Sequence, residues 1–112
     1  MFIFVLFMFS VFRINCDISP DKQHVSSNYG ESVTLSCNYR ASSENIYFFW
    51  YRQHSNQAPQ YLLYKGARSS TYENIPDKRF KSTTSRNSTQ LTIPSLTITD
   101  TAIYYCALRD AQ

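Results

Sequence analysis

The chain has 112 residues, of which 43% are hydrophobic and 16% are aromatic, enough apolar material for the core of one small domain. The formal net charge is +3, and the Lys and Arg residues are scattered along the chain rather than gathered in one block. This scattering argues against a nucleic-acid-binding protein, which concentrates its positive charge on one face.

The first residues form an apolar run, MFIFVLFMFSVF, that is closed by Arg13. This run is too short for a transmembrane helix, which needs about twenty apolar residues. It suits the hydrophobic region of a secretory signal peptide. A buried strand or helix is the alternative, although no polar residues alternate within the run to define a face. We therefore expect residues 1–16 to be a signal peptide that is cleaved after Cys16, and residues 17–112 to be the mature domain.

Alternation of apolar and polar residues dominates the mature chain. In SVTLSCNY the apolar phase carries Val33, Leu35 and Cys37, and the segments QLTI and AIYYC repeat the same period. The segments IYFFWYRQ and QYLLY are denser in aromatic residues, which suits strands that are covered on both sides. Turn-forming clusters such as SNYGE, HSNQAP and SRNS separate these segments. The pattern predicts an all-β domain, an antiparallel sandwich or barrel.

Removal of the leader would leave two cysteines, Cys37 and Cys106. An even pair in a secreted chain predicts a disulfide, and these two lack the neighbouring ligand residues that a metal site requires. Trp50 lies between them, and Tyr104 comes two residues before Cys106. We expect the indole to pack beside the disulfide and the Tyr104 hydroxyl to bond to nearby backbone as a tyrosine corner.

The chain has two histidines, His24 and His54. Neither is accompanied by a nucleophile motif, paired carboxylates or a metal motif, so surface histidines are the better interpretation. We therefore expect no enzyme activity, no catalytic residues, no metal site and no cofactor.

Several segments occur in an order that resembles the immunoglobulin variable domain: ESVTLSC, WYRQ, QAPQYLLYKG, Arg79-Phe80, LTIPSL and DTAIYYCAL. Within that family, WYRQ together with CALR is most similar to the variable segment of a T-cell receptor alpha chain. The resemblance covers the chain from about Ile18 to Gln112. It implies an immunoglobulin V-type antiparallel β-sandwich that lacks the last strand, which a joining segment supplies in this family. No Phe-Gly-x-Gly follows Cys106, as we expect if the chain ends where a germline segment ends.

The resemblance implies that the chain forms, with a T-cell receptor beta chain, the site that recognises peptide antigen presented by a major-histocompatibility molecule. It further implies a glycoprotein that travels through the secretory pathway to the extracellular face of the plasma membrane. Signalling subunits would join through the constant region of the full chain, and no nucleic acid is involved. The alternatives are a T-cell receptor delta or antibody light-chain variable segment, or a standalone V-type immune or adhesion receptor domain.

The same resemblance assigns roles to particular residues. Arg79 and Asp100 are expected to form an ion pair. The candidate antigen-contact residues are Ser42, Ser43, Glu44, Asn45, Ile46 and Tyr47 in the first loop, Lys65, Gly66, Ala67, Arg68, Ser69 and Ser70 in the second, and Leu108, Arg109 and Asp110 at the start of the third. The face expected to pair with the beta chain carries Phe49, Tyr51, Gln53, Pro59, Tyr61 and Tyr105.

One further motif is independent of the resemblance. Asn87-Ser88-Thr89 is an N-x-Ser/Thr sequon within the turn-forming segment SRNSTQ. A surface turn in a secreted protein can accept an N-linked glycan. We therefore expect Asn87 to be glycosylated, while an unused chance sequon is the alternative.

Overall fold

The computed structural model describes residues 2–8, 16–21 and 24–110. Residues 1 and 9–15 of the expected leader, residues 22–23, and residues 111–112 after the start of the expected third loop lie outside the described residues. The described residues form ten strands and one 3-10 helix: β1 (Phe2–Met8), β2 (Cys16–Pro20), β3 (His24–Asn28), β4 (Val33–Ala41), β5 (Asn45–Gln53), β6 (Gln60–Arg68), β7 (Glu73–Asn74), β8 (Lys81–Thr84), β9 (Ser88–Ile93), η1 (Ile98–Asp100) and β10 (Ile103–Asp110).

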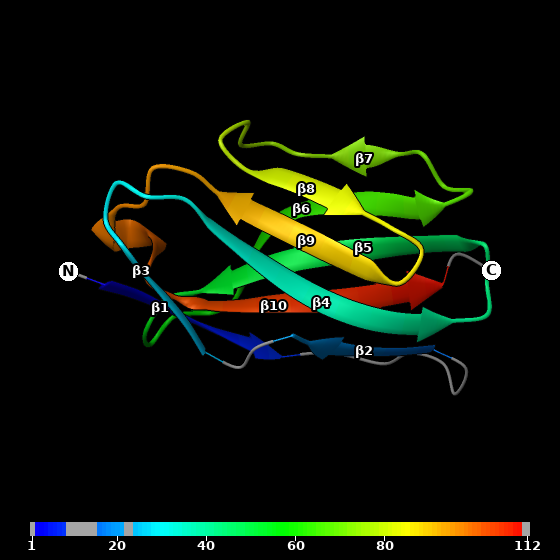
Figure 1. The fold of residues 1–112 in the computed structure, drawn as a ribbon, viewed down its shortest axis with the longest axis horizontal. Coiled ribbons are helices and arrows are strands. Elements are labelled where there is room, and N and C mark those ends of the chain that lie inside the picture. The colour runs from blue at the N-terminus through cyan, green and yellow to red at the C-terminus, as the bar shows by residue number, and fades with distance from the viewer. Residues whose placement is uncertain (1, 9–15, 22–23, 111–112) are drawn as a thin grey trace.

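The strands form two sheets that pack against each other as two layers (Figure 1). One sheet has six strands in the order β3-β1-β10-β5-β6-β7, and the other has four strands in the order β2-β4-β9-β8. The described ladders are antiparallel except for the parallel ladder between β1 and β10. The predicted all-β antiparallel sandwich is therefore confirmed, and the two separate sheets exclude the barrel alternative.

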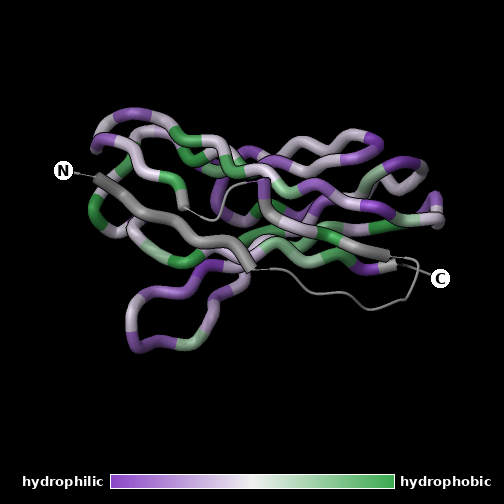
Figure 2. The backbone as a smooth tube through the Cα atoms, turned by 60° about the horizontal axis from the view of Figure 1, so that its bottom comes forward, coloured by the Kyte–Doolittle hydropathy of each residue, from purple (hydrophilic) through white to green (hydrophobic). Residues whose placement is uncertain are grey.

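Side-chain alternation decides which face of each strand is buried. In β4, Leu35 and Cys37 are fully buried, while their polar neighbours point outward. In β5, Phe48 and Trp50 are fully buried, but Tyr51 on the alternate phase is half-buried. Within this chain β5 is thus covered on one face only, in contrast to the expectation from its aromatic density. Figure 2 shows hydrophilic residues gathered at the connecting turns and hydrophobic ones recurring along the strands.

The core lies between the two sheets and is joined across them by a disulfide. Cys37 of β4 and Cys106 of β10 form this bond, as the sequence predicts. Trp50 is fully buried in the same cluster, which also contains Phe48 and Tyr104. Because β4 and β10 belong to different sheets, the disulfide fixes one layer to the other. The remaining large, fully buried members of this core are Ile18, Leu35, Ile46, Leu63, Leu91, Ile93, Leu96 and Leu108.

The segment that we expect to be a leader contributes a strand to the larger sheet. β1 pairs antiparallel with β3 along five residues, Phe2 to Leu6, and parallel with β10 at Phe7 and Met8. Its Phe, Ile and Val residues favour the extended conformation, and both neighbouring strands offer a free edge to it. No helix among the described residues is long and apolar enough to cross a membrane.

Candidate functional site

Two connections and the end of β10 meet at one end of the sandwich, on the right in Figure 1. Residues 42–44 join β4 to β5, residues 69–72 follow β6, and β10 ends beside them. The registers fix this meeting, because Asn45 of β5 pairs with Arg68 of β6, and Ile46 pairs with Asp110 of β10. The expected contact loops therefore share one end of the domain.

The first two loops are bonded directly to each other. The backbone N–H of Ser69 donates to the carbonyl oxygen of Glu44 (2.9 Å), and the Ser69 hydroxyl donates to the same oxygen (2.5 Å). The Ser70 hydroxyl donates to the side-chain oxygen of Asn45. These bonds make the two loops one connected surface rather than two independent turns.

Arg68 holds this surface together from within. Its Nη1 donates to the carbonyl oxygens of Ala41 and Ser43 (2.6 Å each), and its Nη2 donates to that of Arg86 (3.0 Å). The guanidinium also lies over the Tyr39 ring, 5.2 Å from the ring centroid. Arg68 adopts a left-handed backbone conformation (φ 58°), which is uncommon for a residue other than glycine. The sequence placed Arg68 among the antigen contacts, but the structure commits its guanidinium to internal bonds.

Tyr39 is a structural residue that sequence reasoning missed. Its side chain is 4% exposed, and its hydroxyl donates to the carbonyl oxygen of Ser85 (2.7 Å). Burial raises the pKa of this hydroxyl above its ordinary value, although the nearby Arg68 charge opposes the shift. Its position on the inward phase of β4 was visible in the sequence, but its bond to a distant turn was not.

The candidate antigen-contact residues divide by exposure into three groups. Those that are exposed are Ser42, Glu44, Asn45, Ser69 and Arg109. Those that are half-buried are Tyr47, Lys65 and Arg68. Those that are buried, and so support the loops instead of offering contact area, are Ser43, Ile46, Gly66, Ala67, Ser70 and Leu108. The Asp110 side chain lies outside the described part of the chain.

Gly66 has a specific reason to be glycine. A Cβ at this position would lie 2.7 Å from the carbonyl oxygen of Ser70, closer than a carbon side chain tolerates. The Gly66 N–H also donates to the carbonyl oxygen of Tyr72 (2.8 Å). The second loop therefore folds tightly over Gly66.

Two exposed ion pairs border the loop surface. The Glu44 carboxylate forms an ion pair with the guanidinium of Arg86, which lies in the turn between β8 and β9 (2.7 Å). The ammonium group of Lys65 pairs with the carboxylate of Glu73 (2.6 Å). The hydrogen bond from Arg86 lowers the pKa of Glu44 below its usual value. Exposed pairs of this kind contribute little to stability, but they fix the pattern of charge that a ligand meets.

An aromatic face lies on the outer side of the six-stranded sheet. Tyr51 of β5 pairs with Tyr105 of β10 on one side and with Tyr61 of β6 on the other. The Tyr105 hydroxyl donates to the side-chain oxygen of Gln53, and the rings of Tyr51 and Tyr61 meet edge to face at 6.2 Å. Each of these side chains remains half-buried or exposed, Tyr61 to 42%. The face comprises Phe49, Tyr51, Gln53, Pro59, Tyr61 and Tyr105, and all six lie on the surface of this chain.

The aromatic face continues into a hollow toward the loop end. This hollow has a volume of about 340 Å³ and is lined by Tyr47, Phe49, Tyr64, Tyr72 and Arg109. It lies where the expected pairing face meets the start of the expected third loop.

At the opposite end, Arg79 and Asp100 form the expected pair. Arg79 donates from both terminal nitrogens to the Asp100 carboxylate, at 3.1 and 2.6 Å, and also to the carbonyl oxygen of Pro94. The Tyr104 hydroxyl donates to the carbonyl oxygen of Asp100 (2.8 Å), as in a tyrosine corner. Burial, reinforced by the Asp100 charge, raises the pKa of Tyr104 to about 12.

Comparison with known proteins agrees with this arrangement. Residues 19–112 match the family described as immunoglobulin V-set domain. The chain is 38% identical over 80 residues to human T cell receptor alpha variable 26-1, covering 71% of each chain. It is 36% identical over 110 residues to rabbit T-cell receptor alpha chain V region RL-5, covering 94% of this chain and 78% of the relative. Human T cell receptor alpha variable 8-6 is 42% identical over 76 residues, which are 68% of this chain and 66% of the relative.

The chain belongs to the T-cell receptor alpha variable segments of the immunoglobulin V-set family. Variable domains of T-cell receptors are extracellular parts of membrane receptors and are binding domains rather than enzymes.

In this V-set domain a ring nitrogen of His54 forms a hydrogen bond with the carbonyl oxygen of Thr99 (2.7 Å), which links a turn to η1. Among the described residues, no three His, Cys, Asp or Glu side chains gather as a metal site would require.

Proposed function

We propose that this V-set domain pairs with a T-cell receptor beta variable domain through its aromatic face and contributes three loops to a site for peptide presented by a major-histocompatibility molecule. The observation that carries the proposal is the row of Tyr105, Tyr51 and Tyr61 on the outer face of the larger sheet. These residues point away from the disulfide core, so packing within the domain does not explain them. Aromatic residues with few charges are typical of interface cores.

The loop surface supports the recognition part of the proposal. Its exposed members are small and polar, such as Ser42, Asn45 and Ser69, with charges at Glu44 and Arg109. Adaptable polar groups of this kind suit a surface that contacts peptide and helix side chains. The bonds between the first two loops preorganise them, which lowers the entropy that binding must overcome.

The full receptor is the proposed functional form. The chain would reach the plasma membrane through the secretory pathway as part of an alpha chain, and the constant region of that alpha chain would contact the signalling subunits.

The test of the loop assignment uses cells that display the paired receptor, which are screened against a panel of peptide–major-histocompatibility complexes. The proposal predicts that Ser69→Tyr in the loop surface abolishes a response, while Lys78→Ala, an exposed change outside that surface, leaves it intact. Equal responses from both variants would contradict the assignment of the loops.

A further inference from the structure

The turn between β8 and β9 presents Asn87 on a fixed backbone. The N–H of Tyr39 donates to the carbonyl oxygen of Asn87 (2.9 Å), and the Tyr39 hydroxyl holds the carbonyl of Ser85. The Asn87 side chain itself is exposed. A held backbone with a free carboxamide is suited to carry a group attached to that side chain.

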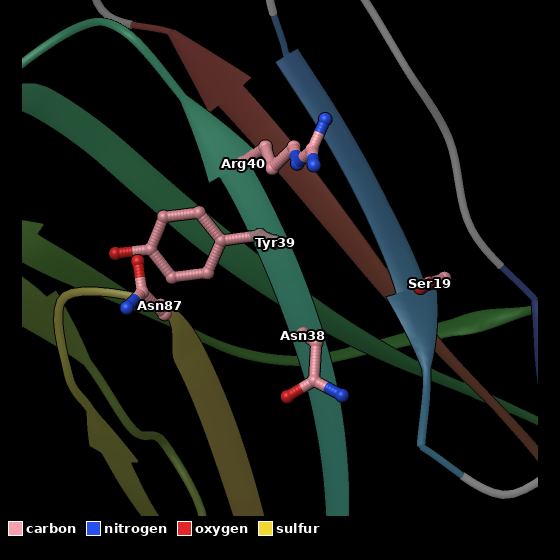
Figure 3. A pocket seen from close by; sticks show the side chains of 5 residues that line it. All are labelled: Ser19, Asn38, Tyr39, Arg40 and Asn87. Atoms are coloured by element: carbon pink, nitrogen blue, oxygen red, sulfur yellow. The ribbon is translucent and has the colours of Figure 1, made fainter.

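Asn87 borders an open hollow of about 430 Å³ on the outer side of the four-stranded sheet (Figure 3). The hollow is also lined by Ser19 of β2, by Asn38 and Arg40 of β4, and by Tyr39. Ser19, Asn38 and Arg40 are exposed, and they offer hydroxyl, carboxamide and guanidinium groups. Such groups match the hydroxyls and the acetamide of an N-acetylated sugar. The hollow belongs to the sheet that does not carry the aromatic face, so a glycan here leaves that face uncovered.

We propose that Asn87 carries an N-linked oligosaccharide whose first sugar lies in this hollow. The side-chain nitrogen of Asn87 forms a bond to the anomeric carbon of an oligosaccharide carried by a lipid pyrophosphate. The bond between that carbon and the pyrophosphate oxygen breaks, the nitrogen loses one proton, and the lipid pyrophosphate leaves. No oxidant or reductant is needed.

The structure also assigns the order of modification and folding. The sequon depends on the hydroxyl of Thr89, which a transferase must reach. In the folded domain Thr89 is fully buried, its hydroxyl donates to the carbonyl oxygen of Thr83 (3.4 Å), and its backbone pairs with Cys37 and Thr84. Transfer therefore occurs on the chain before β9 enters its sheet.

The first experiment uses the complete receptor alpha chain with its partner, produced in secretory cells. The wild type and Thr89→Ser, which keeps the sequon, gain a glycan whose removal by a glycosidase increases gel mobility. Thr89→Val, which keeps the shape but removes the hydroxyl, shows no shift. Absence of a shift in the wild type would overturn the proposal.

The order of events is tested on unglycosylated receptor with the transferase and a lipid-linked donor. The unfolded chain is modified, while the refolded receptor stays unmodified. Equal modification of both would overturn the assigned order.

The position of the first sugar is tested by thermal melting of receptor trimmed to one sugar. Compared with Asn87→Gln, the trimmed protein has a Tm that is higher by about 3 °C, a shift within reach of one or two added hydrogen bonds. The difference disappears in the Arg40→Ala background and persists in Lys81→Ala, an exposed change on β8 away from the hollow. No difference, or one that survives Arg40→Ala, would contradict contact between the sugar and the hollow.

Discussion

Asp100 shows how one buried charge is held in this domain. Its side chain is 1% exposed, and it accepts hydrogen bonds from Arg79 (2.6 Å) and from the backbone N–H of Thr97 (2.9 Å). Burial alone would raise the pKa of this carboxyl. The bonds from Arg79 and Thr97 and the charge of Arg79 outweigh burial and lower it.

Removing Arg79 should destabilise the domain strongly, because the Asp100 charge would stay buried without its main partner. We expect Arg79→Ala to reduce the free energy of unfolding by about 3 kcal/mol, toward the lower end for a broken buried pair. The measurement is a double-mutant cycle with Asp100→Ala in chemical denaturation of the paired variable domains. Strictly additive effects of the two changes would show that the pair is not coupled.

The lowered pKa of Asp100 predicts a pH dependence. Because the folded pKa lies below the unfolded value of about 3.9, the stabilisation is fully present above that value. It is lost as the pH falls through the folded pKa. We expect the wild type to lose more stability than Asp100→Asn between about pH 5 and pH 2. Parallel stability curves for the two proteins over this range would contradict the shift.

At the scale of elements, the sequence predicted the strands well, but it predicted poorly which contacts the side chains make. Alternation identified the buried phase of β4, because a period of two places alternate side chains on opposite faces of a strand. The resemblance placed Tyr51 on the expected pairing face, and its side chain is half-buried on the phase opposite to Trp50. The bonds from Arg68 to the carbonyl oxygens of Ala41, Ser43 and Arg86 were not foreseen, because long-range side-chain contacts leave no local pattern in the sequence. The pairing of β1 was also unforeseen, since a long-range ladder leaves no local signal.

The loop surface should loosen when Arg68 is removed. Arg68→Ala deletes three hydrogen bonds that connect β6 to the first loop and to the β8–β9 turn. We expect hydrogen exchange of the Ser69 amide, which bonds Glu44, to become at least about tenfold faster, the equivalent of one charged hydrogen bond. Lys81→Ala, an exposed change on β8, serves as the control. Unchanged exchange at Ser69 would rule out the bracing role.

The edge of β10 is a second feature at this scale. In the chain with its leader, β1 pairs with β10 at Tyr104 and Tyr105 and so covers part of this edge. A strand that follows β10 through a hairpin would run antiparallel to it and compete with β1 for the same edge.

Without β1, the edges of β3 and β10 that it covers are unpaired, and unpaired strand edges should promote association between molecules. We expect residues 17–112 alone to self-associate in size-exclusion chromatography, and a strand-forming segment fused after Gln112 to give a monomer that melts cooperatively. A control fusion interrupted by prolines cannot form the ladder and should not help. A monodisperse, cooperatively melting monomer of residues 17–112 would contradict this expectation.

At the scale of the whole molecule, three surfaces lie apart from one another on one sandwich. The aromatic face lies over β10, β5 and β6 of the larger sheet, the loops occupy one end, and the hollow beside Asn87 lies on the smaller sheet. The disulfide between Cys37 and Cys106 fixes the two layers. The family resemblance could assign the residues of the aromatic face, because they lie within or beside the sequence motifs that carry it. It could not locate the hollow, which brings together β2, β4 and a distant turn.

Pairing through the aromatic face is the central claim, and its most direct test is the affinity of this domain for a beta variable domain. Tyr51→Asp places a charge in the middle of the tyrosine row, where we expect the dissociation constant to rise by at least about 30-fold, as for an interface hot spot. Thr83→Asp places the same charge on the outer surface of β8 and should leave affinity unchanged. Both variants should melt cooperatively. Wild-type affinity for a well-folded Tyr51→Asp would contradict the account.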